Sequence, residues 1–418
     1  MAPSRSDVSS TDIRVPRPVL SGRAAGRCSR PDKTGRGTLV AVCAGLLSLV
    51  LARAGAAEAA TRPTGPAPAA NAALQYWLAF AVLPVLNDEE DALVAQFATA
   101  PIDEKVEKVV SRSETALRLM HRGAALRHCD WGLNLEADGP GTMLPHLAKA
   151  RQLCRLACLR ARWRFERGED QAAFDDLTAV FRLARHLEQD SILIGILVRI
   201  ALERGAITVA AARLPRAKPE ALRAFRDAIG ALPPTATMKD AIEAERRFCL
   251  GWIRRKFDET GPKKGLAALL VLMGKDEDAK AVLKATGGTE EGLRKFLDEA
   301  DAFYTELADL QPLTRDEFEP AVRAFEEKVE KANHLIKMLV PAVGRSWYSE
   351  AAARTKLAML KAAIDVALEG KAALEKHKDP YGDGPFGYKA LRGKAFELRS
   401  RLVVPKKGPV VLRVGGGG

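Results

Sequence analysis

The sequence predicts a mainly α-helical fold, an irregular array of antiparallel helix pairs that is tetratricopeptide-like in part and ends in a small C-terminal β-hairpin. Aromatic residues make up only 6% of the 418 residues, while alanine and leucine are abundant, and this composition favours helices over a β-sandwich. Apolar residues recur at helical spacing through most of the chain. Connections are short and marked by Gly or Pro, as antiparallel helix neighbours require.

Charge is concentrated at the two ends of the chain. Residues 1–60 contain nine basic and four acidic residues, and residues 389–418 contain eight basic residues against Glu397 alone. The body between them holds equal numbers of basic and acidic residues, so the formal net charge of +12 belongs to the ends. The composition therefore requires no nucleic-acid-binding face, and we expect no nucleic-acid partner.

Residues 1–60 have the order of an export leader. Arg30, Lys33 and Arg36 precede the uncharged, mostly apolar run 38–52, and small residues follow it up to a cleavage site near Ala59. The run is shorter than the roughly 20 residues of a membrane-spanning helix, which favours a cleaved signal peptide, and the alternative is a signal anchor in the inner membrane. A Pro/Ala linker follows at 61–70. The sequence thus predicts export to the periplasm or cell envelope.

The helical body is predicted over residues 71–377, with a division into two subdomains near 231–236. The segment 73–86 is apolar on most sides, so we expect a helix in the centre of the fold. Asn87 and the acids after it indicate a helix start. Residues 147–185 resemble one tetratricopeptide unit, without a second copy in register. The predicted helices are 73–86, 103–127, 144–167, 170–188, 191–213, 238–257, 263–273, 276–285, 288–309, 315–340 and 346–376, and a loop is predicted at 128–143.

The tail, residues 378–418, differs from the body. Turn-forming residues at 379–388 precede two β-prone segments, 395–398 and 410–412, and a turn at 407–409 between them predicts a hairpin. A basic tail of this kind predicts weak, salt-sensitive contact with an anionic surface. The residues predicted to make this contact are Lys389, Arg392, Lys394, Arg399, Arg401, Lys406 and Lys407.

Polar residues are densest in and beside the loop 128–143. Cys129 lies between His128 and Asp130, which are the residue types of a thiolate nucleophile and its base, and His146 follows nearby. His121 and His128 are seven residues apart, so one helix face would present both to a metal ion. No known catalytic or metal motif accompanies these residues. The catalytic candidates are therefore His128, Cys129 and Asp130, and the alternative is a purely structural loop.

In the structural alternative, Trp131 and Leu133 plug the top of a helical hairpin. Asp130, Asn134 and Asp138 then cap helix ends. We favour this interpretation, because neighbours on an extended chain point apart.

Cysteines and charged groups elsewhere have similar alternatives. Cys154 and Cys158 are four residues apart on a predicted helix, which fits half a metal site or two small buried side chains. Disulfides are permitted outside the cytoplasm, and the pairing of Cys129, Cys154, Cys158 and Cys249 stays open. Asp175 and Asp176 have the residue types of the catalytic carboxylate pair of a glycosidase, but we favour the interpretation that they are solvated acids near a helix end. The arginines of 151–164 predict a mostly solvated helix face.

Two stretches resemble a known group of proteins. NAALQYWLAFAVLP (71–84) and the CDWG-containing segment 116–168 are similar to a group of exported, helix-rich bacterial proteins with no assigned activity. The tail is similar to their C-terminal module, in which a DPxxGxPxxY stretch opens a hairpin. Asp379, Pro380, Pro385 and Tyr388 match that stretch, whereas Asp383 stands where the group has glycine. The resemblance implies a signature loop at CDWG and carries over no catalytic residues.

These observations lead to two functional hypotheses. The first is an exported helical scaffold that binds a protein or peptide partner along a groove between helices. The second is an envelope enzyme or metal-binding protein that uses His121, His128, Cys129 and Asp130. We expect no cofactor.

Overall fold

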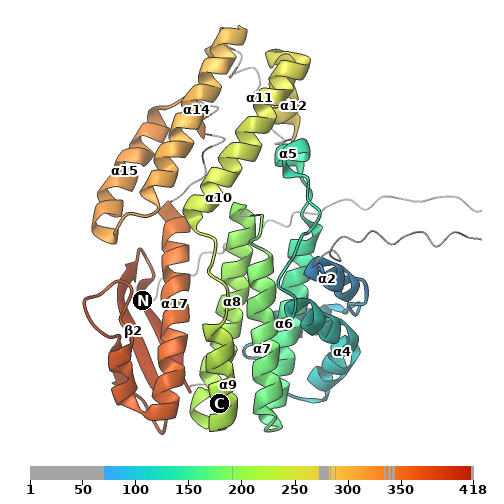
Figure 1. Ribbon diagram of the computed structural model, residues 1–418, viewed down its shortest axis with the longest axis vertical. Helices are drawn as coiled ribbons and strands as arrows, with labels where there is room; N and C mark the ends of the chain where they lie inside the picture. The colour runs from blue at the N-terminus through green and yellow to red at the C-terminus, as the bar shows by residue number, and fades with distance from the viewer. Residues whose placement is uncertain are drawn as a thin grey trace, which may run out of the picture. The chain divides into compact units, whose positions relative to one another are not determined.

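The computed structural model describes residues 70–415, apart from 191, 273–281, 283, 288, 334–335, 338–339 and 341–343. All the described residues belong to one compact unit, Pro68–Gly418. The predicted leader with its cleavage site near Ala59, nearly all of the linker, and much of the predicted helix 276–285 lie outside the described residues. The described part is mainly α-helical with a small antiparallel C-terminal sheet, as predicted (Figure 1). None of its helices combines the length and the apolar character that crossing a bilayer requires.

The N-terminal helices begin at capping residues. They are α2 (Ala72–Ala81), α3 (Asp88–Ala95) and α4 (Glu104–Ala124). Asn71 caps α2, Asn87 forms a capping box at the start of α3, and the Asp103 carboxylate accepts hydrogen bonds from the first free amides of α4. The predicted helix start at Asn87 and the predicted helix 103–127 are confirmed.

Helix α2 corrects a prediction. It ends at Ala81, five residues before the predicted end, and the chain from 83 to 87 is not helical. One side of α2, which includes Tyr76 and Phe80, is buried, but Leu74 and Leu78 are exposed. The helix is therefore half-exposed and not central. Apolar residues on every side of a helix predicted full burial, but only one side has a neighbour to pack against.

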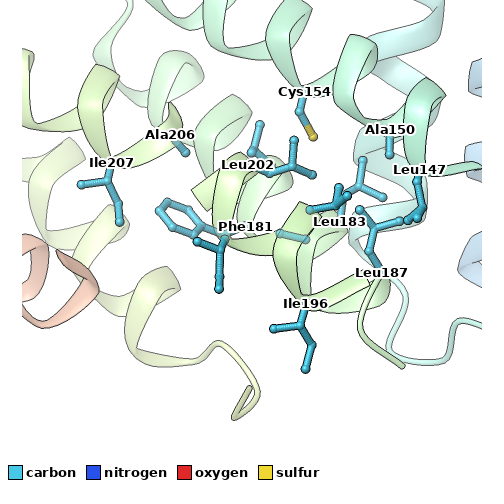
Figure 2. Close-up of a cluster of buried hydrophobic side chains, with 14 of the residues drawn as sticks. Leu147, Ala150, Cys154, Phe181, Leu183, Leu187, Ile196, Leu202, Ala206 and Ile207 are labelled. Carbon is cyan, nitrogen blue, oxygen red and sulfur yellow. The ribbon is translucent and has the colours of Figure 1, made fainter. Parts of the chain in front are cut away.

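Three long helices form the centre of the core. They are α6 (Pro145–Glu166), α7 (Asp170–His186) and α8 (Leu193–Arg213). Helix α7 packs against both of the others, and Figure 2 shows side chains of all three meeting, including Cys154, Phe181 and Ile207. Gly168 adopts a positive φ of 75° between α6 and α7, which allows the sharp reversal of the helical hairpin. Helices α2 and α4 cover one side of this layer, and α17 covers the other (Figure 1).

Helix α9 in the second half of the body was not predicted. Its residues Ala221, Leu222, Phe225 and Ile229 are buried against α7 and α17, and their helical spacing is a signal that the sequence contains. A five-residue π-helix, 246–250, interrupts the predicted helix 238–257 between α10 and α11. The helices are α9 (Pro219–Gly230), α10 (Met238–Glu245), α11 (Gly251–Thr260), α12 (Pro262–Leu272), α14 (Glu290–Leu310), α15 (Arg315–Lys331) and α17 (Gly344–Glu369), followed by the 3₁₀ helix η5 (Lys371–Lys376).

The tail forms a three-stranded antiparallel sheet in the order β1-β2-β3, so the predicted hairpin gains one strand. The strands are β1 (Gly387–Ala390), β2 (Phe396–Val404) and β3 (Gly408–Val414). Both β2 and β3 pack against α17, and the Gly415 amide after β3 donates to the Ala211 carbonyl of α8. The tail is thus part of the folded unit and not a separate appendage.

Candidate functional site

The loop that follows α4 is tied to the start of α2. The Asn71 side chain donates to the Asp130 carbonyl (2.7 Å) and accepts from the Asp130 amide (2.8 Å), while the Ala72 amide donates to the His128 carbonyl (2.8 Å). The Asp130 carboxylate accepts from the Gly132 amide (2.8 Å), and Gly132 has a positive φ of 71°. These bonds hold the backbone of residues 128–132, the CDWG loop, against the start of α2.

Trp131 holds the loop down by filling an aromatic pocket. Its ring stacks on His146 from α6 at a centroid distance of 4.6 Å and on Tyr76 from α2 at 5.7 Å. The rings of Trp77 and Phe80 also contact Trp131, at centroid distances of 6.0 and 6.3 Å. The Trp131 indole N–H donates to the His186 carbonyl (2.8 Å), so its one polar group is satisfied. The structure therefore supports the expectation that Trp131 acts as a plug.

Two buried histidines border this pocket. The Tyr76 hydroxyl lies 2.8 Å from Nδ1 of His186. Burial raises the pKa of Tyr76, so the phenol keeps its proton and donates a hydrogen bond to Nδ1. Burial lowers the pKa of His186 to about 4, and it lowers the pKa of His146 to about 4 as well. Both imidazoles are neutral at pH 7 and act as packing groups.

Cys129 is not an activated nucleophile. Burial, followed by the negative charges of Asp190 and Asp130, raises the pKa of its thiol to about 12. A reactive cysteine needs the opposite shift, produced by a nearby positive charge. The side chain of His128 is exposed, whereas Cys129 is 98% buried, and no hydrogen bond of the described residues joins the two side chains. The catalytic candidates His128, Cys129 and Asp130 therefore lie together in sequence without forming a nucleophile–base pair.

His121 belongs to a different cluster, centred on Asp176. The Asp176 carboxylate, which is fully buried, accepts from Nε2 of His121 (2.7 Å), from both Nε (3.0 Å) and Nη2 (2.5 Å) of Arg160, and from Nη1 of Arg164 (2.9 Å). Arg160 also donates to Glu114 (2.8 Å). Burial acts to raise the pKa of Asp176, but these hydrogen bonds and positive charges outweigh it, and the pKa is lowered.

This cluster corrects two predictions. Asp176 was expected among solvated acids and Arg160 on a solvated helix face, but both are buried and joined across α6 and α7. The helical pattern could not reveal them, because a buried ion pair leaves the same charges in the sequence as a solvated one.

The metal candidates are not brought together. Within the described residues, no group of three or more His, Cys, Asp or Glu side chains is placed to hold a metal ion. Cys129, Cys154, Cys158 and Cys249 are free cysteines, and burial raises the pKa of both Cys154 and Cys158.

Only one of the three expected helix caps in the loop is formed. The Asn134 side chain accepts from the Ala137 amide at the start of the short helix α5 (Leu135–Asp138). Asp138 makes no capping hydrogen bond, and Asp130 stabilises a turn and not a helix.

The turn-rich stretch of the tail is organised by Asp379. Its carboxylate accepts from the Ser400 hydroxyl (2.7 Å), the Tyr381 amide (3.1 Å) and the Arg401 amide (2.6 Å), which joins the turn to β2. The residue types of this stretch therefore serve the fold. The basic residues of the tail are exposed in three places: Lys389 in β1 with Arg399 and Arg401 in β2, Arg392 and Lys394 between these strands, and Lys406 and Lys407 in the turn before β3.

An exposed apolar surface lies beside the loop, on α2. Leu74 and Leu78 are 61% and 53% exposed, and Val82 and Val85, which follow on the same stretch of chain, are 45% and 88% exposed. We call these four residues the α2 stripe. Leu74, Leu78 and Val82 are spaced four apart, the spacing that places residues on one helix face. The spacing of these apolar residues is visible in the sequence, but together with the apolar residues around them it predicts a central helix and not an exposed face.

Comparison of the chain with protein-family models, with curated proteins and with solved structures finds no match in any of the three.

Proposed function

We propose that this protein is an exported helical scaffold of the cell envelope that binds a protein partner through the α2 stripe. The observation that carries the proposal is the exposure of Leu74, Leu78, Val82 and Val85. Large apolar side chains gathered on one exposed surface are typical of interaction sites. The surface combines one face of α2 with the non-helical chain that follows it, and it is not the predicted groove between helices.

The charge next to the stripe indicates the chemistry of the partner. Four acidic residues, Asp88 to Asp91, begin α3 directly after Val85. Glu89 pairs with Lys105 and Glu90 with Arg112, while Asp88 and Asp91 form no ion pair among the described residues. An anionic lipid surface would be repelled by these carboxylates, whereas a basic segment would be attracted.

We therefore identify the occupant as an amphipathic helix of another protein, with an apolar ridge and basic residues at one end. A ridge with side chains at i, i+4 and i+7 would lie along the α2 stripe. Its basic end would lie over Asp88 and Asp91. The enzymatic alternative lacks an equivalent observation, because the thiol of Cys129 has a raised pKa.

The experiment places a photo-crosslinking amino acid at Leu78 in the full chain within cells, with the same amino acid at Val403 as the control. Val403 is also an exposed apolar residue, at 40% against 53% for Leu78, but it lies on β2. We expect an adduct from position 78 only, and the crosslinked peptide should be amphipathic and basic. The double substitution Asp88→Lys and Asp91→Lys should lower the yield several-fold.

Three results would contradict the proposal. They are an adduct of twice the chain mass, which would identify a second copy as the occupant, an adduct with lipid alone, and equal yields from positions 78 and 403.

A further inference from the structure

A pocket lies where the C-terminal sheet meets α8 and α17. It has a volume of about 450 Å³, within the range of sites that hold small molecules. It is lined by Thr208 of α8, by Lys356 of α17 and, from the sheet, by Glu397, Arg399, Val411, Leu412 and Arg413. Three of these seven side chains are cationic, which distinguishes the pocket from the apolar surface on α2.

Lys356 has hydrogen-bonding capacity that the fold leaves unused. Its ammonium donates to the Val411 carbonyl of β3 (2.7 Å), and it forms no ion pair with a carboxylate of the described residues. An ammonium group has three N–H donors, so two stay available. Burial, and after it the positive charge of Arg204, lowers the pKa of Lys356.

The two arginines share a single carboxylate. Glu397 and Arg413 lie opposite each other on β2 and β3, and Nε of Arg413 is 3.1 Å from the Glu397 carboxylate. Nη2 of Arg399 reaches the other oxygen of the same carboxylate at 3.5 Å. A guanidinium has five N–H donors in a planar fork that matches the oxygens of a phosphate. Both arginines contact Glu397, their side chains are mostly exposed, and each keeps donors for a ligand.

We propose that this pocket binds the phosphate group of a phosphomonoester. Lys356, Arg399 and Arg413 against Glu397 leave two positive charges, and a phosphomonoester carries about −1.5 to −2 at pH 7, whereas a carboxylate carries only one negative charge. Thr208 also lines the pocket, and its hydroxyl donates to the Arg204 carbonyl (2.8 Å), which leaves the oxygen able only to accept. The pocket is larger than a phosphate group and is open to solvent, so it leaves room for the organic group. This site is separate from the α2 stripe and does not depend on the proposed function.

The test is isothermal titration of the full chain with glycerol 3-phosphate at fixed ionic strength. The test variant is Lys356→Met, and the matched control is Lys407→Met, which removes the same charge from an exposed position in the turn before β3. We expect the affinity to fall about tenfold in Lys356→Met, because one charge-assisted hydrogen bond is lost, and less than twofold in Lys407→Met. Arg413→Gln should lower the affinity several-fold, and it decides the question if Lys356→Met fails to fold, since Lys356 also anchors β3.

A second arm separates a soluble ligand from a lipid with the same chemistry. Vesicles that contain phosphatidic acid, whose headgroup is also a phosphomonoester, are sedimented with the same variants. Binding of either probe that is sensitive to Lys356→Met but not to Lys407→Met supports the site and identifies its source. Absence of binding to both probes, or equal weakening by the two lysine substitutions, overturns the proposal.

Discussion

The CDWG loop and the α2 stripe are neighbours, yet they differ in how much of their chemistry the fold already uses. In the loop, Asn71 and Asp130 bond each other, Trp131 is buried, and the Cys129 thiol has a raised pKa. On the stripe, Leu74 and Leu78 are covered by nothing in the described residues. A dense cluster of reactive residue types is therefore not evidence of a site unless some of its groups stay unpaired.

The largest effect that tests this comparison is expected at Trp131. Replacing it with alanine should lower the free energy of unfolding by about 4 kcal/mol, because the truncation leaves a cavity between α2 and α6. Urea denaturation measures the change. The control is Trp163→Ala, which removes a partly exposed indole stacked under Arg167, and its effect should be well under half as large. Equal effects would mean that the loop is not anchored by Trp131.

The second test concerns the ion cluster around Asp176. Asp176→Ala should cost about 3 kcal/mol of stability, because it leaves the buried guanidinium of Arg160 without its main partner. Asp175→Ala is the matched control on the same helix, since Asp175 is exposed and bonds only Gln171. Its effect should stay within about 0.5 kcal/mol. If the two aspartates proved equivalent by thermal or urea unfolding, the cluster would be a surface feature.

The third test uses pH on the two buried histidines. Their folded-state pKa of about 4 is below the unfolded value of about 6.5, so the unfolded chain binds more protons as the pH falls. Each histidine contributes stability that is complete above pH 6.5 and is lost as the pH falls towards 4. Between pH 8 and pH 5 the loss is about 2 kcal/mol per histidine.

A variant isolates this contribution from opposing groups. Burial raises the pKa values of Glu188 and Glu245 to about 7, so these carboxyl groups favour the folded state as the pH falls from 7 to 4.5. The measurement therefore compares wild type with His146→Gln at pH 8 and at pH 5. The wild type should lose about 2 kcal/mol more than the variant over this interval. Identical losses would show that His146 titrates as an exposed histidine does.

The smallest effect on stability is expected at the α2 stripe. Leu78→Glu should change the free energy of unfolding by less than about 0.5 kcal/mol, because its side chain is already half-exposed. Chemical denaturation again supplies the value. A loss of 2 kcal/mol or more would show that Leu78 is a core residue and would remove the basis of the proposed interaction surface.

Much of the fold could be predicted from the sequence, because helical periodicity and caps are local signals. Asn87 and Asp103 show this, since each is identified by the residues just after it. The predictions that were wrong concern residues whose burial depends on parts of the chain that are distant in sequence. The exposure of Leu78 depends on which neighbours α2 has, and the burial of Asp176 depends on Arg160 on another helix. The plug role of Trp131 was predicted, but its pocket could not be, because α2 and α6 supply the walls.

One experiment measures both the free energy of unfolding and the capture of the partner for Trp131→Ala and Leu78→Glu. Capture is read from a crosslinker placed at Val85, next to the altered position. We expect the two variants to differ in opposite ways in stability and in adduct yield. Trp131→Ala should be strongly destabilised, and below its unfolding midpoint temperature it should still yield the adduct, whereas Leu78→Glu should be as stable as wild type and yield almost none. If Leu78→Glu kept the full yield of adduct, the claim that the α2 stripe is the binding surface would be contradicted.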